Sequence, residues 1–230
     1  MEIKWIGQSG YLLDDKTTRI LIDPYLSDIV NRVSKRSRMV EPPFSPESFK
    51  GDAVICTHNH LDHLDPDAVS GFNKSMLFIS PPSCKERLSG LGCQRIKTLS
   101  VGDSITVGSF TITAVSAFHT VEAIGLIVEN NGVRMYFSSD TLFDERLFEI
   151  KKFEPDLMFI CINGRLGNMN VDEAVRLTGI IGPRVGIPTH YGMFISNTED
   201  PGKYISKVKR GFEMAFNKNY DINEILGGSV

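Results

Sequence analysis

The sequence predicts an α/β fold in which two β-sheets pack together between outer layers of helices. Strand and helix patterns alternate from residue 53 to residue 99, and they alternate again from residue 157 onward. Four closely spaced strand patterns lie between these two parts, from residue 104 to residue 137. Such alternation indicates a layered α/β structure, here with two β-rich halves. At 230 residues, without an internal repeat, the chain is expected to form a single domain over residues 1–230.

The first strands are predicted from alternating apolar residues. Residues 3–13 alternate with an interruption at 7–10, which predicts two strands joined by a tight bend. Residues 19–24 predict a third strand that ends at Pro24. Residues 27–46 have no period, so we expect a long loop with at most one helical turn, which acts as a lid or a binding loop, or else a solvated basic loop without such a role. Its basic residues are Arg32, Lys35, Arg36 and Arg38.

The same patterns predict the strands and helices of the next two parts of the chain. Apolar runs predict strands at 53–56, 76–79 and 95–99, with short helices at 66–72 and 83–88 between them. The middle part predicts strands at 104–107, 110–117, 123–129 and 133–137, and the last two of these are joined by a hairpin turn at Asn130-Asn131-Gly132. A helix is expected at 143–151, with Asp140 or Thr141 as its cap.

The last third alternates once more between strands and helices. Strands are predicted at 157–162 and 185–188, separated by a Gly/Asn-rich loop at 163–170 and a helix at 171–181. Asn170 is the predicted N-cap of that helix, and Glu173 completes a capping box. A final amphipathic helix is expected at 201–217. The four cysteines are expected to be free thiols, although Cys84 and Cys93 are close enough in sequence to form a pair.

Three of the five histidines lie together after the strand predicted at 53–56. They are His58, His60 and His63, and Asp62 lies among them. Imidazole and carboxylate groups are ligands for Zn²⁺, Mn²⁺ and Fe²⁺. A tight loop can direct His58 and His60 one way and Asp62 and His63 another, which is the geometry for two neighbouring metal ions. The alternative is a polar surface loop that is rich in histidine without binding a metal.

The histidine cluster resembles the signature of a known family. Its pattern His-x-His-x-Asp-His resembles that of the metallo-β-lactamase superfamily, and the later strand-end residues match that family's other motifs. The resemblance covers nearly the whole chain and implies an αββα sandwich of two mixed β-sheets flanked by helices. It also implies two divalent metal ions, zinc or manganese, as cofactors. By this resemblance one ion is held by His58, His60 and His119, the second by Asp62, His63 and His190, and Asp140 bridges the two.

The resemblance implies hydrolytic chemistry. Two divalent ions lower the pKa of a bridging water from ~15.7 toward ~7, which supplies hydroxide at neutral pH. Asp62 is expected to bind metal and to orient this nucleophile, while His190 or Tyr191 is the candidate for assisting the leaving group. For Tyr191 the alternative is a packed aromatic side chain. The redox branch of the family has a glutamate where this chain has His60, so hydrolysis is expected.

A closer resemblance is to the ascorbate-6-phosphate lactonase branch of the superfamily. It includes the motifs Asn-Gly-Arg at 163–165, Gly-Asn-Met at 167–169 and Pro-Thr-His-Tyr-Gly-Met-Phe at 188–194, although the chain lacks the insertion that those lactonases carry in the first loop. The resemblance implies a lactone or ester of a small anionic metabolite, such as a phosphorylated sugar, as substrate. Arg165 is expected to bind its anion, or else only to hold its own loop. The other expected substrate contacts are Asn163, Asn168 and Tyr191.

Two rival functions are a phosphodiesterase or nuclease of the same fold, and a metal-binding protein without catalytic activity. A nuclease usually needs a basic arm, and with a net charge of −3 only residues 32–38 qualify, so no nucleic-acid partner is expected. The full ligand set argues against the non-catalytic alternative.

No run of about 18 apolar residues occurs, and the first residues lack the apolar stretch of a signal peptide, so a cytoplasmic protein without membrane contact is expected. The sequence leaves open whether the chain is a homo-oligomer.

Overall fold

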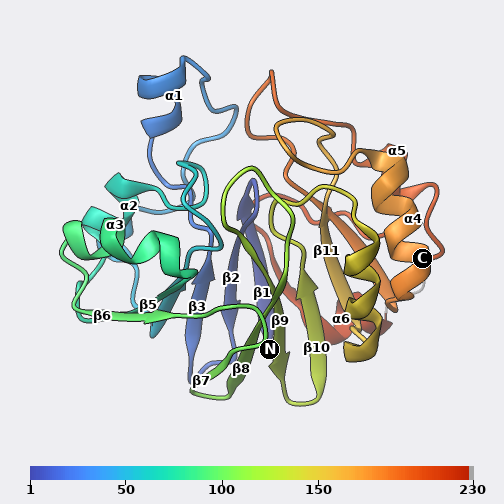
Figure 1. Cartoon of the computed structure of the whole chain (residues 1–230), viewed down its shortest axis with the longest axis horizontal. Coiled ribbons are helices and arrows are strands. Elements are labelled where there is room, and N and C mark those ends of the chain that lie inside the picture. The colour runs from blue at the N-terminus through green and yellow to red at the C-terminus, as the bar shows by residue number, and fades with distance from the viewer. Residues whose placement is uncertain (228–230) are drawn as a thin grey trace.

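The computed structural model describes residues 1–227, which form two mixed β-sheets that face each other between outer helices (Figure 1). Across the seven-stranded sheet the order is β13 (Asn219–Asp221), β1 (Glu2–Gly7), β2 (Gly10–Asp14), β3 (Arg19–Ile22), β4 (Ala53–Ile55), β5 (Leu77–Ser80) and β6 (Arg95–Thr98). Across the six-stranded sheet the order is β12 (Val185–Thr189), β11 (Leu157–Cys161), β10 (Val133–Phe137), β9 (Ile124–Asn130), β8 (Phe110–Ser116) and β7 (Ser104–Val107). The predicted αββα architecture is confirmed.

Each sheet has an antiparallel part and a parallel part. In the first sheet β13, β1, β2 and β3 pair antiparallel, and β3 through β6 pair parallel. In the second sheet β7 through β10 are antiparallel, and β10, β11 and β12 are parallel. Parallel strands are covered on both faces and therefore read as continuous apolar runs. This explains why every residue of β4 and β11 is buried.

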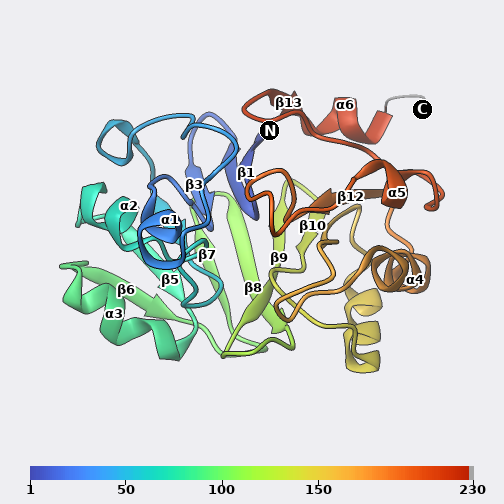
Figure 2. The ribbon, with the colours of Figure 1, turned by 90° about the horizontal axis from the view of Figure 1, so that it is seen from above.

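The helices cover the outer faces of the sheets, as Figures 1 and 2 show. In β4, Ile55 joins the core between the sheets, whereas Val54 faces outward and packs with Val69 and Leu88. Val69 belongs to α2 (Pro66–Gly71) and Leu88 to α3 (Lys85–Gly90), and both helices cover the first sheet. The short 3₁₀ helix η2 (Pro82–Cys84) directly precedes α3. The second sheet is covered by η3 (Glu145–Phe153), α4 (Val171–Ile181) and α5 (Gly202–Ile205). The remaining helices are α1 (Ile29–Ser34), η1 (Pro46–Ser48) and α6 (Ile222–Gly227).

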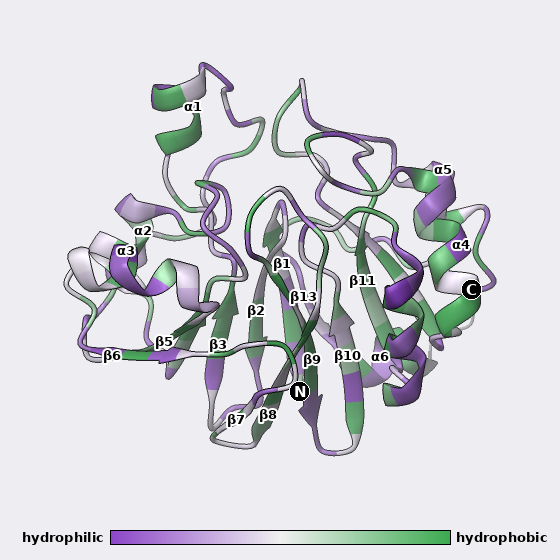
Figure 3. Cartoon of the chain, in the orientation of Figure 1, coloured by the Kyte–Doolittle hydropathy of each residue, from purple (hydrophilic) through white to green (hydrophobic). Residues whose placement is uncertain are grey.

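Burial follows hydropathy in this arrangement. Figure 3 shows mainly hydrophobic strands between outer helices that carry hydrophilic residues on part of their surface.

The capping box predicted for α4 is confirmed, because Asn170 Oδ1 accepts from the amide of Glu173 at 3.0 Å and Glu173 Oε2 accepts from the amide of Asn170 at 2.9 Å. All four cysteines are buried free thiols, as expected. None of the helices within residues 1–227 has the length and hydrophobicity needed to cross a membrane.

The helix predicted over residues 201–217 is wrong. Only α5 is helical in that range, and the chain then runs beside β12, the edge strand of the second sheet. There the amide of Gly186 donates to Arg210 O and the amide of Phe212 donates to Gly186 O, both at 2.9 Å. An edge strand has backbone groups that need partners, and this pairing outweighs the amphipathic pattern. The strand β13 and the helix α6, which follow, were not predicted.

The helix expected at 143–151 also differs from its prediction. It is the 3₁₀ helix η3, and its N-cap is Asp144, whose carboxylate accepts from the amide of Arg146 at 2.9 Å. Asp140 and Thr141 do not cap it. The segment 27–46, predicted to be a loop with at most one helical turn, contains the short helix α1, which projects beyond the sheets at the same end as the loops after β11 and β12 (Figure 1).

Candidate metal centre

The candidate ligands follow four strands of the two sheets. The loop after β4 provides His58, His60, Asp62 and His63, and His119, Asp140 and His190 follow β8, β10 and β12. The first loop is a tight turn, because His60 O accepts from the amides of His63 at 3.1 Å and Leu64 at 2.8 Å. Arg87 of α3 holds the outside of this turn through a 2.7 Å hydrogen bond to Asn59 O. The turn directs its side chains toward the strand ends of the second sheet.

These seven side chains form two groups with metal-binding geometry. The first group consists of His58, His60, His119 and Asp140, and the second of Asp62, His63 and His190. Within each group the potential ligand atoms lie within 4.8 Å of one another. The structure therefore brings together all seven residues that the sequence resemblance implied, in the two predicted sets.

Asp140 lies between the two groups. Its Oδ2 is 3.8 Å from His119 Nε2 and 4.0 Å from His58 Nε2, on the side of the first group. Its Oδ1 is 3.3 Å from His63 Nε2 and 3.2 Å from His190 Nε2, on the side of the second group. One carboxylate thus presents an oxygen to each group, which is the arrangement of a bridging ligand.

The chemistry of these side chains fits a pair of divalent ions. His63 Nε2 and Asp140 Oδ1 are buried without a hydrogen-bond partner among residues 1–227, although they lie 3.3 Å apart. Leaving such a buried group unpaired costs about 1–3 kcal/mol, and a metal ion supplies the missing partner. Burial also lowers the pKa of His58 well below its usual value, and burial together with nearby His119 lowers the pKa of His60. Both rings are therefore neutral at pH 7, as metal ligands must be.

His63 has a different charge state without metal. Burial alone lowers the pKa of this imidazole, but the nearby carboxylates of Asp140, Asp23 and Asp62 outweigh burial and raise the pKa well above its usual value. Asp140 shows the opposite balance, since burial favours its neutral form while His190 and His63 hold the pKa of its carboxyl well below the usual range. A metal ion at Nε2 of His63 therefore competes with a proton for that atom.

Three groups outside the predicted ligand set orient the ligands. Asp23 Oδ2 lies 2.8 Å from His63 Nδ1, Gly167 O lies 2.9 Å from His119 Nδ1, and Gln8 Nε2 donates to Asp62 Oδ2 at 2.8 Å. A hydrogen bond from Nδ1 leaves Nε2 free for a metal ion. The sequence pattern indicates only a strand end at Asp23 and a bend at Gln8. Their position at strand ends, like that of the ligands, was the available signal.

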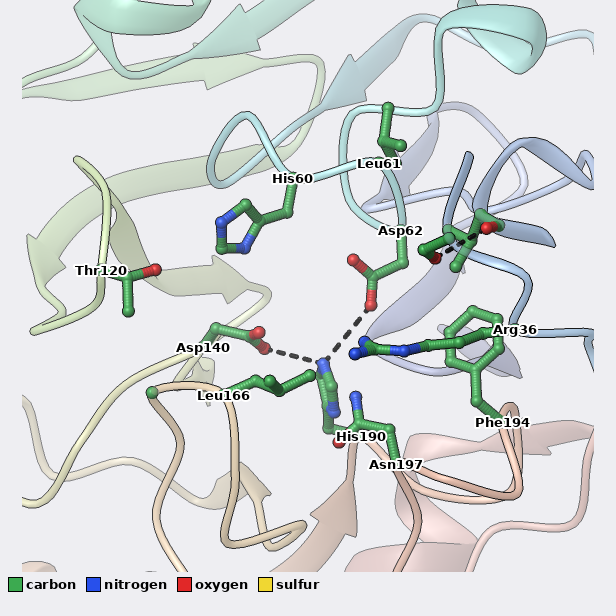
Figure 4. A pocket seen from close by; sticks show the side chains of 13 residues that line it. Arg36, His60, Leu61, Asp62, Thr120, Asp140, Leu166, His190, Phe194 and Asn197 are labelled. Atoms are coloured by element: carbon green, nitrogen blue, oxygen red, sulfur yellow. Dashed lines mark hydrogen bonds and ion pairs between the residues drawn. The ribbon is translucent and has the colours of Figure 1, made fainter. Parts of the chain in front are cut away.

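A pocket opens above the two groups (Figure 4). It has a volume of about 460 Å³, and His60, Asp62, Asp140 and His190 line its floor. Its walls come from α1 and the segment after it, from the loops after β11 and β12, and from Leu61 and Thr120 in the loops after β4 and β8. The wall residues include Val30, Ser34, Arg36, Leu61, Thr120, Leu166, Gly167, Phe194 and Asn197. Of the four basic residues in segment 32–38, Arg36 lines this pocket.

The four residues predicted to contact substrate do not line this pocket. Arg165 is exposed and donates through Nη1 to Ser196 O at 3.1 Å. Asn163 and Asn168 hold the loop instead, with Asn163 Nδ2 donating to Asn197 Oδ1 at 2.8 Å and Asn168 Nδ2 donating to Asn163 Oδ1 at 3.0 Å. Tyr191 is buried against Trp5, with ring centroids 4.8 Å apart, which matches the alternative of a packed aromatic. In their place the structure puts Arg36, Leu166 and Asn197 in the wall.

The chain is similar to known metal-dependent hydrolases. The family described as "Beta-lactamase superfamily domain" matches residues 18–191. A UPF0173 metal-dependent hydrolase from Archaeoglobus fulgidus is 30% identical over 226 residues, which cover 91% of each chain. A UPF0173 metal-dependent hydrolase from Deinococcus radiodurans is 26% identical over 224 residues, covering 93% of this chain and 95% of the relative.

Solved structures share the fold. A metallo hydrolase from Ignicoccus hospitalis superposes with a TM-score of 0.78 at 22% identity, covering 96% of this chain and 98% of the other. An isothiocyanate hydrolase from Delia radicum gut bacteria superposes with a TM-score of 0.80 at 19% identity, covering 96% of this chain and 99% of the other. At these identities the likeness shows the fold alone.

Proposed function

Because this chain belongs to the β-lactamase superfamily domain family, we propose that it is a metal-dependent hydrolase of a lactone or ester of a small anionic metabolite. The proposal depends mainly on one observation, which is that a pocket of about 460 Å³ has the two ligand groups at its floor and the guanidinium of Arg36 in its wall. The ligand groups provide a place for the reacting carbonyl. The guanidinium provides a cation in the wall of the same pocket.

The metal ions and the protein side chains have separate tasks in this proposal. Two divalent ions lower the pKa of a water molecule toward neutrality and polarise a carbonyl or phosphoryl oxygen when they are bound. Asp62 lines the pocket, and Gln8 fixes one of its oxygens by the 2.8 Å hydrogen bond, so its carboxylate is oriented to hold a proton from the attacking water. His190 Nε2 lies 3.6 Å from Asp62 Oδ2 and lines the pocket as a ligand atom of the second group, whereas Tyr191 does not line the pocket and is therefore not placed to assist the leaving group.

The size and lining of the pocket support a small substrate. Val30, Leu61, Leu166 and Phe194 give it apolar walls that exclude water from the reacting group. A nuclease of this fold needs an extended basic surface for the phosphate backbone. Here the net charge is −3, and the basic segment contributes to the pocket wall through Arg36. These features favour a small anionic molecule over nucleic acid as substrate.

The test is a substrate panel with controlled metal content. Metal is removed with a chelator, and the protein is reloaded with Zn²⁺ or Mn²⁺ before it is given lactones, p-nitrophenyl phosphodiesters and short RNA. We expect lactone opening that disappears on chelation and returns with metal, and that is lost in Asp62→Ala. Faster cleavage of phosphodiesters or RNA than of any lactone would instead establish a phosphodiesterase. No turnover of any substrate by the loaded protein would contradict the proposal.

A further inference from the structure

Arg36 is a cation of the pocket wall without a partner in the protein. It lies just after α1, is half-buried and lines the same pocket as Asp62 and His190. Figure 4 shows its side chain extending from the wall with the guanidinium directed toward these two residues. Among residues 1–227 its guanidinium forms no hydrogen bond or ion pair. Its five donors are therefore available to a molecule in the pocket.

The neighbouring basic residues are all engaged. Arg32 pairs with Asp67 of α2, and Lys35 Nζ donates to Arg32 O at 3.5 Å. Arg38 donates through Nε to Val40 O at 2.6 Å and through Nη1 to Ser27 O at 2.8 Å, and its guanidinium lies 4.9 Å from the centre of the Tyr25 ring. Arg38 therefore holds its own segment together. Arg36 differs from these residues both in lacking a partner and in facing the ligand groups.

The backbone places Arg36 in a defined position. Lys35 caps α1 in the left-handed conformation, with φ 58° and ψ 30°, and its amide donates to Asn31 O at 2.9 Å. This conformation is unfavourable for a residue with a side chain, and it turns the chain at the end of the helix. On the other side of Arg36, the amide of Met39 donates to Met193 O at 2.7 Å. The segment is thus fixed on both sides, so a ligand bound to Arg36 meets a largely preorganised group.

We propose that Arg36 binds an oxyanion of the substrate, a carboxylate or a phosphate, while the lactone or ester group lies at the metal ligands. This inference rests on the proposed function for the location of the reacting group. A planar guanidinium matches two oxygens of either anion with parallel hydrogen bonds, which a lysine does not reproduce. Arg36 therefore determines specificity for anionic over neutral substrates.

The test compares matched charged and neutral probes. The probes are a γ-lactone with a carboxylate substituent, the same ring with a phosphate ester, and the same ring with a carboxamide. Their affinities for the metal-loaded protein are measured by calorimetry, and kcat/KM is measured in parallel. Arg36→Met is compared with Arg32→Met, which removes a charge from α1 outside the pocket. Metal content and melting temperature are recorded for both, and Arg36→Lys is a second, milder variant.

We expect Arg36→Met to weaken binding of the charged probes by about 10- to 100-fold, the range for a hydrogen bond to a charged group. Binding of the carboxamide stays unchanged, and Arg32→Met leaves all probes unchanged. Arg36→Lys restores only part of the loss. The loss of affinity for the carboxylate probe, compared with the loss for the phosphate probe, shows which anion Arg36 prefers.

Other results would overturn the inference. If Arg36→Met lost the same affinity for charged and neutral probes, Arg36 would only shape the pocket. A wild type that binds charged probes no better than the carboxamide would show that no anion site exists there. A selective loss in Arg165→Met, but not in Arg36→Met, would place the anion at Arg165. If the selective loss of binding is found but no probe is hydrolysed, the proposed function fails and the role of Arg36 stands.

Discussion

Asp23 Oδ2 accepts a hydrogen bond from Nδ1 of His63 at 2.8 Å, and both side chains are buried. The same carboxylate also accepts from the amide of Thr57 at 2.7 Å and from its hydroxyl at 2.6 Å. Asp23 lies at the end of β3, whereas Thr57 and His63 belong to the loop after β4. One carboxylate therefore connects two strand ends and fixes the ring that presents Nε2 to the second ligand group.

Replacing Asp23 by Asn tests this role. Asn is accommodated at the φ of 44° found here, but it accepts fewer hydrogen bonds and carries no charge. We expect the affinity of the second metal site to fall by about 10- to 100-fold, the usual effect of losing a hydrogen-bond partner of a ligating histidine. Competition titration with a chromophoric chelator measures this. Asp28→Asn, an exposed change on the same segment, is the control, and equal metal affinity in both variants would contradict the assignment.

The ligand sets themselves are tested by metal content. His60→Ala is expected to lose most of the metal at the first site, because water replaces a protein ligand poorly. Asp140→Ala is expected to lower occupancy of both sites, because its two oxygens face different groups. Elemental analysis after dialysis measures the metal bound per chain. Unchanged metal content in both variants would refute the proposed ligand sets.

The ligand sets follow from the family resemblance, whereas the roles of the orienting residues and of Arg36 in the pocket wall depend on the three-dimensional structure. His58, His60 and His63 are adjacent in sequence, so their common location follows from one short loop. Arg36 reaches the pocket because Lys35 turns the chain in a left-handed conformation. A lysine at this position does not indicate such a turn, as a glycine would. Arg165 was chosen because its loop follows a strand that leads to the site, yet its side chain turns away to Ser196. Direction of a side chain depends on backbone angles that the sequence does not display.

The same limit applies to the end of the chain. Residues 201–217 have an amphipathic pattern, but residues 210–212 satisfy the edge of β12 instead of forming a helical turn. The backbone groups that need hydrogen-bond partners belong to β12, some 25 residues earlier in the chain. The pattern of residues 201–217 alone therefore does not indicate this pairing. By contrast, Asn170 and Glu173 form their capping box from residues three apart, and this feature was predicted correctly.

Asp15 is expected to make stability depend on pH. Burial raises the pKa of this half-buried carboxyl, but hydrogen bonds from Ser109, from the hydroxyl and amide of Thr17 and from the amide of Thr18 outweigh it and lower the pKa below its usual 3.8. An acid whose pKa is lower in the folded state stabilises the protein above its unfolded pKa, and this contribution is lost as pH falls toward the folded value. Ser109 lies between β7 and β8, so the contribution links the two sheets.

The expected result is a pH-dependent difference between the wild type and Asp15→Asn. The melting temperature of the metal-free variant should be lower than that of the wild type at pH 7, and the difference should narrow as pH falls below about 3.8. Glu86→Gln, which changes an exposed carboxylate of α3, serves as the control. A difference that stays constant from pH 7 to pH 2 would show that the Asp15 carboxylate is not selectively stabilised in the folded state.

Gly167 is expected to be required for the first metal site. Its φ is 91°, and a Cβ added there would lie 2.8 Å from His119 Nδ1 and 3.0 Å from Thr120 Cγ2. Its carbonyl oxygen also accepts the hydrogen bond from His119 Nδ1. Gly167→Ala therefore combines a backbone conformation that disfavours a side chain with a clash against a metal ligand. Since His119 must rotate to relieve the clash, its Nε2 moves away from the first ligand group, and metal affinity at that site should fall by about 10- to 100-fold.

The matched control for this variant is Gly132→Ala. Gly132 has a φ of 79° in the β9–β10 turn, but an added Cβ meets no atom within 4 Å. Both variants should lose about 1–2 kcal/mol of stability from the left-handed conformation, as seen in their melting curves without metal. Only Gly167→Ala should also bind less metal at the first site, with the second site retained, in a chelator competition. If Gly167→Ala binds both ions as tightly as Gly132→Ala, the added Cβ does not displace His119, and the expected requirement for glycine at this position is refuted.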